Sequence, residues 1–294
     1  MVKLACNYLN ELKELIEEKR ITNIDYIKIF SIVPRLFGFE WAIENGYKIM
    51  LHGFPGIGNN MGTIDYFENA DFDMMKKCVE RSRTPYLSFH INISKTKKQL
   101  EIKNSMNDEE YTKKVIEIFK YNVSKIKEIF KLDILLETHA TRPETEPEIC
   151  RRPEVINEIL EKADCGLLFD LSHSRRIARI LDITLEEFIN KIDMKKIKEI
   201  HINGMMKNKI GEWEDTHSKL REEDYEKIEK LLIEYPNIEI LTLEYGATGE
   251  IMDEETRKNA VIVTENGVNP EAKEELYEQI IRLQEIIRKV NKTV

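Results

Sequence analysis

Gly166-Leu-Leu-Phe-Asp-Leu-Ser-His173 is a short apolar run that ends in a carboxylate, with an imidazole three residues further along the chain. An uninterrupted apolar run of this length is typical of a strand buried on both faces, as strands are in parallel sheets. We therefore predict a buried strand over residues 166–171. A turn after this strand can bring Asp170 and His173 to the same end of the sheet.

The same pattern recurs along the chain, with helix-length stretches between the apolar runs. These stretches carry apolar residues at three- and four-residue spacing, which predicts helices, most clearly at 108–130, 220–234 and 271–290. Asn107 or Asp108 is the expected cap of the first of them. The six further strands are expected at 24–30, 47–52, 86–91, 132–138, 197–203 and 238–245.

This alternation determines the expected fold class. Seven strands that alternate with helices predict parallel βα units, and the length of 294 residues favours an α/β protein with a (β/α)8 TIM barrel over a six-stranded doubly wound sheet. The eighth strand is weakly marked, and 260–264 is the candidate. No linker rich in proline, glycine or serine divides the chain, so we expect a single barrel domain over residues 1–294.

Composition excludes several classes of protein. The net charge of −9 disfavours nucleic acid as a partner, because phosphate backbones attract basic proteins. The N-terminal segment lacks the apolar core of a signal peptide, and no run approaches the ~18 apolar residues of a membrane span, so we expect a cytoplasmic protein that does not enter membranes. The cysteines have no C-x-x-C spacing and are expected to be reduced thiols; they are Cys6, Cys78, Cys150 and Cys165.

Imidazoles and carboxylates stand at or just past the ends of successive predicted strands. In a parallel barrel these ends meet at one face, where ligands from different strands can converge on several divalent metals. One such residue alone is more often a structural histidine or an ion-paired acid. So many acids at the mouth of an apolar barrel need compensating cations. The expected metal ligands are His52, His90, Glu137, Asp170, His173, His201, Asp215, His217 and Glu244.

Two further regions contain histidines, at 215–217 and at His139. Asp215-Thr-His217 is expected in a polar loop after the strand at 197–203, where side chains two apart in extended chain share one face. His139, the sixth histidine, lies past the end of the strand at 132–138. We expect His139 at the rim, outside the site.

Seven motifs in chain order carry a resemblance to a known family: LHGFPGIG, YLSFHINIS, LLET, LLFDLSH, EIHING, EDTHSKL and LTLEYG. The chain is similar to the multinuclear non-heme iron-dependent oxidative enzymes of the methanobactin-biosynthesis type, which belong to the xylose isomerase-like TIM-barrel superfamily. The similarity covers roughly residues 20 to 250. It implies two or three iron ions, oxidation of a cysteine in a ribosomally made peptide, and a separate small recognition protein as a partner.

The resemblance also implies how the ligands divide among the metals, with Glu137 as a bridge and with Glu137, Asp170 and His173 as the residues on which catalysis depends. The chain departs from many of these enzymes at 171–173, where they carry asparagines, and at Lys28, where they often place an acid. The three implied ligand sets are His52, His90 and Glu137; then Glu137, Asp170, His201 and Glu244; then His173, Asp215 and His217.

Two other activities use overlapping ligands. A zinc-dependent phosphodiesterase of the endonuclease IV kind has the same nine-ligand order, but the acidic loop at 212–215 and the net charge disfavour DNA binding. A sugar isomerase or epimerase needs only the second ligand set, on one manganese or magnesium ion, and leaves the other ligands without a role. We therefore expect a metal-dependent oxidoreductase that holds iron, with zinc or manganese as the alternatives.

Overall fold

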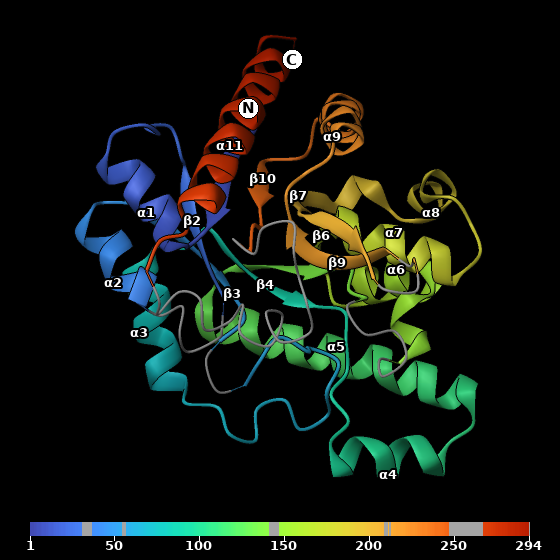
Figure 1. Cartoon of the computed structure of the whole chain (residues 1–294). Coiled ribbons are helices and arrows are strands. Elements are labelled where there is room, and N and C mark those ends of the chain that lie inside the picture. The colour runs from blue at the N-terminus through green and yellow to red at the C-terminus, as the bar shows by residue number, and fades with distance from the viewer. Residues whose placement is uncertain are drawn as a thin grey trace. The chain divides into compact units, whose positions relative to one another are not determined.

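The computed structural model describes residues 1–30, 37–54, 57–140, 147–208, 211, 213–246 and 267–293 (Figure 1). Eight strands form a closed barrel in the order β1-β10-β7-β6-β5-β4-β3-β2, and the pairs between neighbours are parallel. The expected (β/α)8 TIM barrel is therefore confirmed. The barrel strands are β1 (Lys3–Asn7), β2 (Tyr26–Phe30), β3 (Lys48–His52), β4 (Tyr86–His90), β5 (Asp133–Glu137), β6 (Gly166–Asp170), β7 (Ile197–Ile202) and β10 (Ile240–Leu243).

Seven of these strands lie within two residues of their predicted bounds, and the eighth does not come from the expected segment. The candidate eighth strand at 260–264 lies outside the described residues. β1 is the eighth strand of the barrel, and it lies between β10 and β2. β1 pairs with β2 on one side and with β10 on the other, which buries Leu4, Ala5 and Cys6. The sequence gives no clear strand signal here because only three apolar residues separate Lys3 from Asn7.

The chain divides into two compact units, residues 1–49 with 199–294 and residues 50–198. The expectation of one domain over the whole chain stays a prediction. In the first unit, α11 packs against β1, α1 and α9. Its buried residues recur every three or four positions, as in Leu276, Ile280 and Leu283. This unit also contains α1 (Asn10–Glu17), α2 (Phe37–Glu44), β8 (Gly204–Lys207), β9 (Trp213–Ser218), α9 (Glu222–Glu234) and α11 (Pro270–Thr293).

The second unit contains the strands from β4 to β6 and the helices before, between and after them. Neighbouring registers place Ser88 opposite His52 and Glu137 opposite His90. The positions at the ends of these strands are therefore neighbours in space. The helices are α3 (Phe72–Ser82), α4 (Lys97–Ser105), α5 (Asp108–Phe130), α6 (Pro153–Lys162), α7 (Leu171–Ile180) and α8 (Leu185–Lys191), with short 3₁₀ turns η2 (Glu148–Arg151) and η3 (Met194–Lys196).

Two helices begin with a side-chain cap, and the cap of the second involves two candidate site residues. The prediction for α5 is confirmed at both ends, and Asn107 and Glu110 form a capping box at its start. The predicted strand at 166–171 ends one residue early, because Leu171 begins α7. The Asp170 side chain caps this helix by accepting a hydrogen bond from the His173 backbone amide at 2.7 Å.

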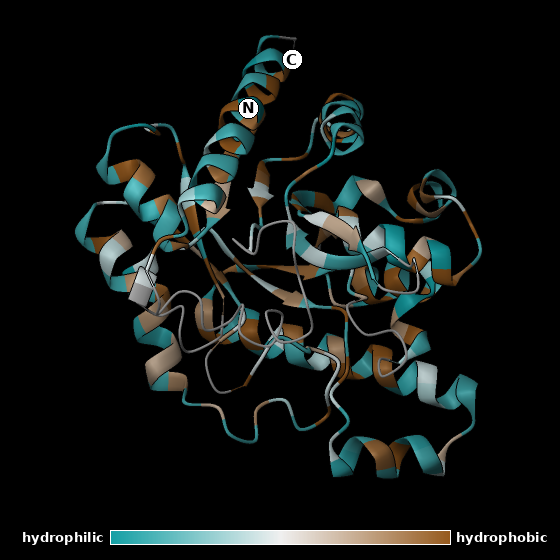
Figure 2. Ribbon diagram, viewed as in Figure 1, coloured by the Kyte–Doolittle hydropathy of each residue, from teal (hydrophilic) through white to brown (hydrophobic). Residues whose placement is uncertain are grey.

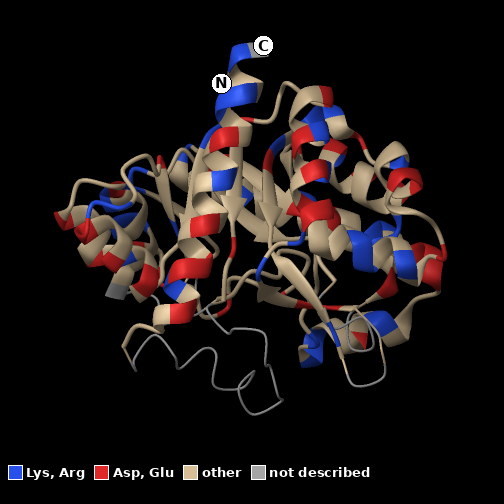
Figure 3. Cartoon of the chain, turned by 45° about the horizontal axis from the view of Figure 1, so that its top comes forward, with Lys and Arg blue, Asp and Glu red and all other residues tan. Residues whose placement is uncertain are grey.

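Apolar and charged residues separate in the way that a buried parallel sheet requires. Figure 2 shows alternating brown and teal along α5, as expected for a helix with one buried face. Figure 3 shows acidic and basic residues interspersed along α11, where Lys273 contacts Glu14 and Glu18 of the α1 region at 3.0 and 2.9 Å. Among the described helices, none is both long enough and apolar enough to cross a membrane.

Candidate metal centre

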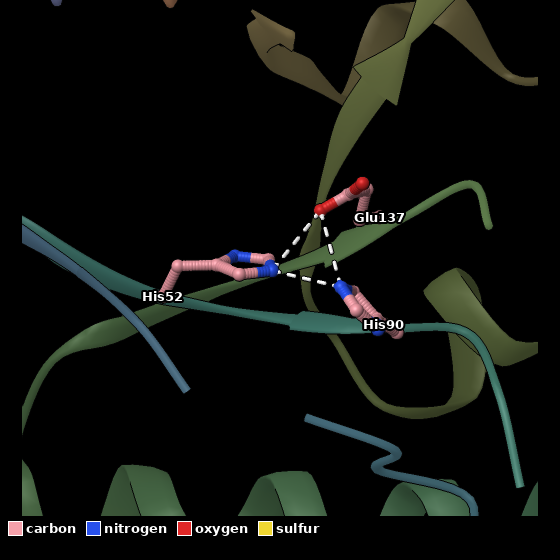
Figure 4. Close-up of side chains that lie close together, drawn as sticks. All are labelled: His52, His90 and Glu137. Atoms are coloured by element: carbon pink, nitrogen blue, oxygen red, sulfur yellow. Dashed lines mark hydrogen bonds and ion pairs between the residues drawn. The ribbon is translucent and has the colours of Figure 1, made fainter. Parts of the chain in front are cut away.

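His52, His90 and Glu137 stand at the last positions of three neighbouring strands, and their side chains converge (Figure 4). The two Nε2 atoms lie 2.9 Å apart, and Glu137 Oε2 lies 3.3 Å from His52 Nε2 and 3.8 Å from His90 Nε2. A single point about 2 Å from all three atoms satisfies these separations, and about 2.0–2.1 Å is the usual distance from a metal to such ligands. The three residues therefore fit one metal ion, as the first predicted ligand set requires.

The orientation of the His52 ring follows from a residue on the neighbouring strand. His52 Nδ1 lies 2.9 Å from the Ser88 hydroxyl, which itself donates to the Leu51 carbonyl oxygen at 3.4 Å. When the hydroxyl donates to this carbonyl it accepts from the imidazole, and Nδ1 is then the donor of the ring. The lone pair of a neutral His52 is then at Nε2, the atom that faces His90 and Glu137. This arrangement is typical of a metal-binding histidine held by a second hydrogen bond.

The two carboxylate oxygens of Glu137 face different imidazoles. Oε2 faces His52 and His90, whereas Oε1 lies 3.2 Å from His173 Nδ1. His173 Nδ1 also lies 3.0 Å from the Thr138 carbonyl oxygen, which can only accept, so the proton is on Nδ1 and the lone pair of a neutral ring is on Nε2. Glu137 and His173 are both buried. Glu137 Oε2 therefore faces the two imidazole nitrogens, whereas Oε1 faces the N–H of His173.

His139 lies inside this cluster, which corrects the expectation of a rim position. The residue is 7% exposed, and its ring stacks on His90 with centroids 4.0 Å apart and meets the His173 ring edge-on at 4.8 Å. Asn92 donates to His139 Nδ1 at 3.2 Å. The sequence does contain a signal for this position, because His139 lies two residues after Glu137, a spacing that favours the same face of extended chain.

In the first unit, His201 and Glu244 form a second buried contact. His201 Nδ1 lies 2.8 Å from Glu244 Oε1, and the register that pairs His201 with Thr242 on β10 brings them together. Burial alone would raise the pKa of the Glu244 carboxyl, but His201, His217 and Lys28 together lower it to about 2. Glu244 is therefore ionised, and its Oε1 accepts no hydrogen bond from the described residues. Ionised oxygen beside imidazole nitrogen suits a divalent cation.

Asp215 and His217 lie on β9 of a two-stranded hairpin, where the sequence predicted a loop. His217 adopts a left-handed backbone with φ of 53°, and its Nε2 lies 3.6 Å from Asp215 Oδ1. Its Nδ1 lies 4.0 Å from Glu244 Oε2, so this pair is next to Glu244. A Cβ on Gly204 would lie 2.2 Å from the Lys219 carbonyl oxygen, so glycine is required where the hairpin begins.

The second and third predicted ligand sets join residues of both units. Within each unit, the structure brings together Glu137, Asp170 and His173, and separately His201, Glu244, Asp215 and His217. How these two groups combine on metals stays a prediction.

Fold and donor chemistry together define a class. A closed parallel barrel with clustered imidazoles and carboxylates at its strand ends is typical of a metal-dependent enzyme of the (β/α)8 type. Within that class, the chain belongs to the family described as RiPP precursor modification enzyme MbnB/TglH/ChrH, whose family model matches residues 39–241. RiPP denotes a ribosomally made, post-translationally modified peptide. The resemblance inferred from the seven motifs is thereby confirmed.

Individual relatives agree with this assignment. The chain is 28% identical over 170 residues to a UPF0276 protein of Psychromonas ingrahamii, and 23% identical over 181 residues to one of Vibrio parahaemolyticus. These matches cover 57% and 60% of this chain but only 59% and 61% of the two relatives.

Solved structures share the barrel fold. A D-tagatose 3-epimerase-like protein superposes with a TM-score of 0.58 at 17% identity, covering 99% of both chains. A D-psicose 3-epimerase from Clostridium cellulolyticum gives 0.60 at 13% identity, covering 97% of this chain and 99% of that one. At these identities the likeness concerns the fold alone.

Proposed function

We propose that this protein is a multinuclear iron-dependent oxidase that modifies a cysteine of a ribosomally made peptide. Membership of a peptide-modifying enzyme family supports the substrate class. The observation that carries the metal assignment is the convergence of His52 Nε2, His90 Nε2 and Glu137 Oε2, which lie within 3.8 Å of one another. When bound, iron would supply the redox chemistry with O₂ that side chains lack, and a mixed imidazole and carboxylate shell suits it.

The proposed ligand sets are those implied by the sequence. His52, His90 and Glu137 would hold one ion, and Glu137 would share a second with Asp170, His201 and Glu244. The position of each residue at or next to a strand end of the closed barrel supports this division. A third ion would be held by His173, Asp215 and His217.

The chain's own residues would also orient the metal ligands. With its Nδ1 proton donated to Thr138, His173 would direct Nε2 toward the third ion. Asp170 fixes the start of α7 and thereby the place of His173. Stacking of His139 on His90 holds both rings in place. A separate small recognition protein is the proposed partner for delivering the peptide.

Metal content tests the bridging role of Glu137 directly. Protein is purified anaerobically from iron-supplemented cells, and metal is measured by elemental analysis and Mössbauer spectroscopy. Glu137→Ala should lose more than one iron equivalent, because one carboxylate contributes to two ions. The matched control is Glu11→Ala, which removes another buried glutamate, one that accepts a hydrogen bond from the Asn269 amide. The control should keep its iron.

Loss of a single equivalent from Glu137→Ala, with the rest retained, would contradict bridging. The reaction is tested by incubating iron-loaded protein and O₂ with the peptide encoded next to its gene. An O₂-dependent mass change confined to cysteine is expected. Cleavage of abasic DNA by zinc-loaded protein, without any change in the peptide, would instead favour the phosphodiesterase.

A further inference from the structure

A fully buried ion pair lies next to His201. Lys28 on β2 and Glu199 on β7 have completely buried side chains, and Lys28 Nζ lies 2.7 Å from Glu199 Oε1. The Thr242 hydroxyl donates to the same oxygen at 2.5 Å. Burying two charges costs several kcal/mol of desolvation, and such a pair is often no more stabilising than apolar residues of the same volume. Stability alone therefore gives no reason for placing this pair here.

The pair determines which nitrogen of His201 carries the proton. Glu199 and His201 are two residues apart on β7, so their side chains lie on the same face, and Glu199 Oε1 is 3.0 Å from His201 Nε2. A carboxylate paired with lysine can only accept, so Nε2 is the donor. In a neutral ring the lone pair is then on Nδ1, the atom that lies 2.8 Å from Glu244 Oε1.

Two electron-pair donors thus lie close together at Nδ1 and Oε1. Two ligands at right angles on one metal ion at about 2.1 Å would be about 3 Å apart, close to this separation. Glu244 Oε1 accepts no hydrogen bond from the described residues, although it is buried. A cation shared by His201 and Glu244 satisfies both atoms.

We propose that Glu199, neutralised by Lys28, is a positioning residue that fixes the tautomer of His201 and so directs Nδ1 to the metal beside Glu244. The inference rests on the proposed function, because it concerns the second ion of that centre. A carboxylate behind a ligating histidine is a recurrent device for orienting the ring, and its loss typically lowers metal affinity about 10- to 100-fold. Lys28 supplies the charge that allows the carboxylate to be buried.

The tautomer is read from long-range ¹H–¹⁵N spectra of the histidine rings in metal-free, full-length protein at about pH 8, where an ordinary imidazole is neutral. We expect His201 to carry a proton on Nε2 in the wild type. The double variant Lys28→Met with Glu199→Leu removes both charges and the acceptor. It should show a mixture of tautomers and about 10- to 100-fold weaker binding at the second iron position in a chelator competition. A purely structural role would change thermal stability but leave the tautomer as it was.

The conservative double variant, Lys28→Met with Glu199→Gln, retains an acceptor oxygen and should recover the Nε2–H ring and most of the affinity. A wild-type ring with no proton on Nε2 would overturn the proposal without any variant. Unchanged tautomer and affinity in the leucine double variant would do the same. Failure of the proposed function looks different, because Glu244→Ala would then bind as much metal as the wild type. Loss of metal in Glu244→Ala, with full retention in the leucine double variant, would refute only the role of Glu199.

Discussion

Lys28→Met should destabilise the protein strongly, because it leaves Glu199 buried without its cation. Both side chains are completely buried and their charged atoms are 2.7 Å apart. Removing one partner of such a pair typically costs about 3–5 kcal/mol. Glu199 keeps hydrogen bonds from His201 and Thr242, so we expect a value near the lower end, about 3 kcal/mol. This is a large part of the roughly 5–15 kcal/mol that stabilises an ordinary domain.

The free energy of unfolding is measured in urea on metal-free protein, so that metal loss does not contribute to the change. The double variant Lys28→Met with Glu199→Leu removes both charges and should lie within about 1 kcal/mol of the wild type. Glu199→Leu leaves Lys28 buried without its anion and should also cost about 3 kcal/mol, so a double-mutant cycle should give a coupling energy of about 5 kcal/mol. The matched control is Lys13→Met, which removes one partner of the exposed Lys13–Glu17 pair at 3.8 Å and should cost less than about 0.5 kcal/mol.

A cost below about 1 kcal/mol for Lys28→Met would refute the reasoning, as would a double variant whose cost equals the sum of the two single variants. Either result would mean that Glu199 does not depend on Lys28 for its burial.

Four further outcomes follow from single features of the structure. His139→Phe should keep near-normal iron content because it preserves stacking on His90, whereas His139→Ala should lose iron in elemental analysis; equal losses would contradict the stacking role. Burial raises the pKa of the Cys165 thiol to about 12, so intact-mass analysis should find it unalkylated until the protein is unfolded in urea. Gly204→Ala should cost about 1–3 kcal/mol in urea unfolding, because its Cβ would overlap a carbonyl oxygen, and no cost would refute that overlap. Burial tends to raise the pKa of Glu199, but Lys28 and the neighbouring imidazole lower it to about 2 from 4.5. The free energy of unfolding of the wild type should therefore fall as the pH falls from 4.5 towards 2. It should fall more steeply than that of the double variant Lys28→Met with Glu199→Leu, which lacks this carboxylate.

Barrel strands could be predicted from the sequence wherever burial on both faces left an uninterrupted apolar run. The strand at 166–171 is predicted because Leu167, Leu168 and Phe169 are all buried, which leaves no polar residue between Gly166 and Asp170. β1 gives a weaker signal because its burial depends on pairing with β10, more than 230 residues away. Local pattern does not contain that pairing.

Site residues were predictable for the same reason that the strands were. His52, His90 and Glu137 end apolar runs, and parallel strands bring their ends together, so convergence follows from topology. The sequence did not predict the place of His139 because this residue follows its strand, and only the fold shows that its ring stacks on the His90 ring. The hairpin that carries Asp215 depends on contacts with β8, which the polar sequence of that region does not indicate.

Lys28 and Glu199 show why a charged residue in a strand is ambiguous in sequence. Each interrupts an apolar run, and each alone is consistent with an exposed edge position. β1 and β10 lie between their strands in the sheet, so the two side chains do not meet as neighbours in the ladder but within the interior of the barrel. Their pairing therefore depends on barrel closure, which brings together the concave faces of β2 and β7. The charge that fixes His201 is thus a consequence of the closed topology, and it acts on a histidine one residue before the end of β7.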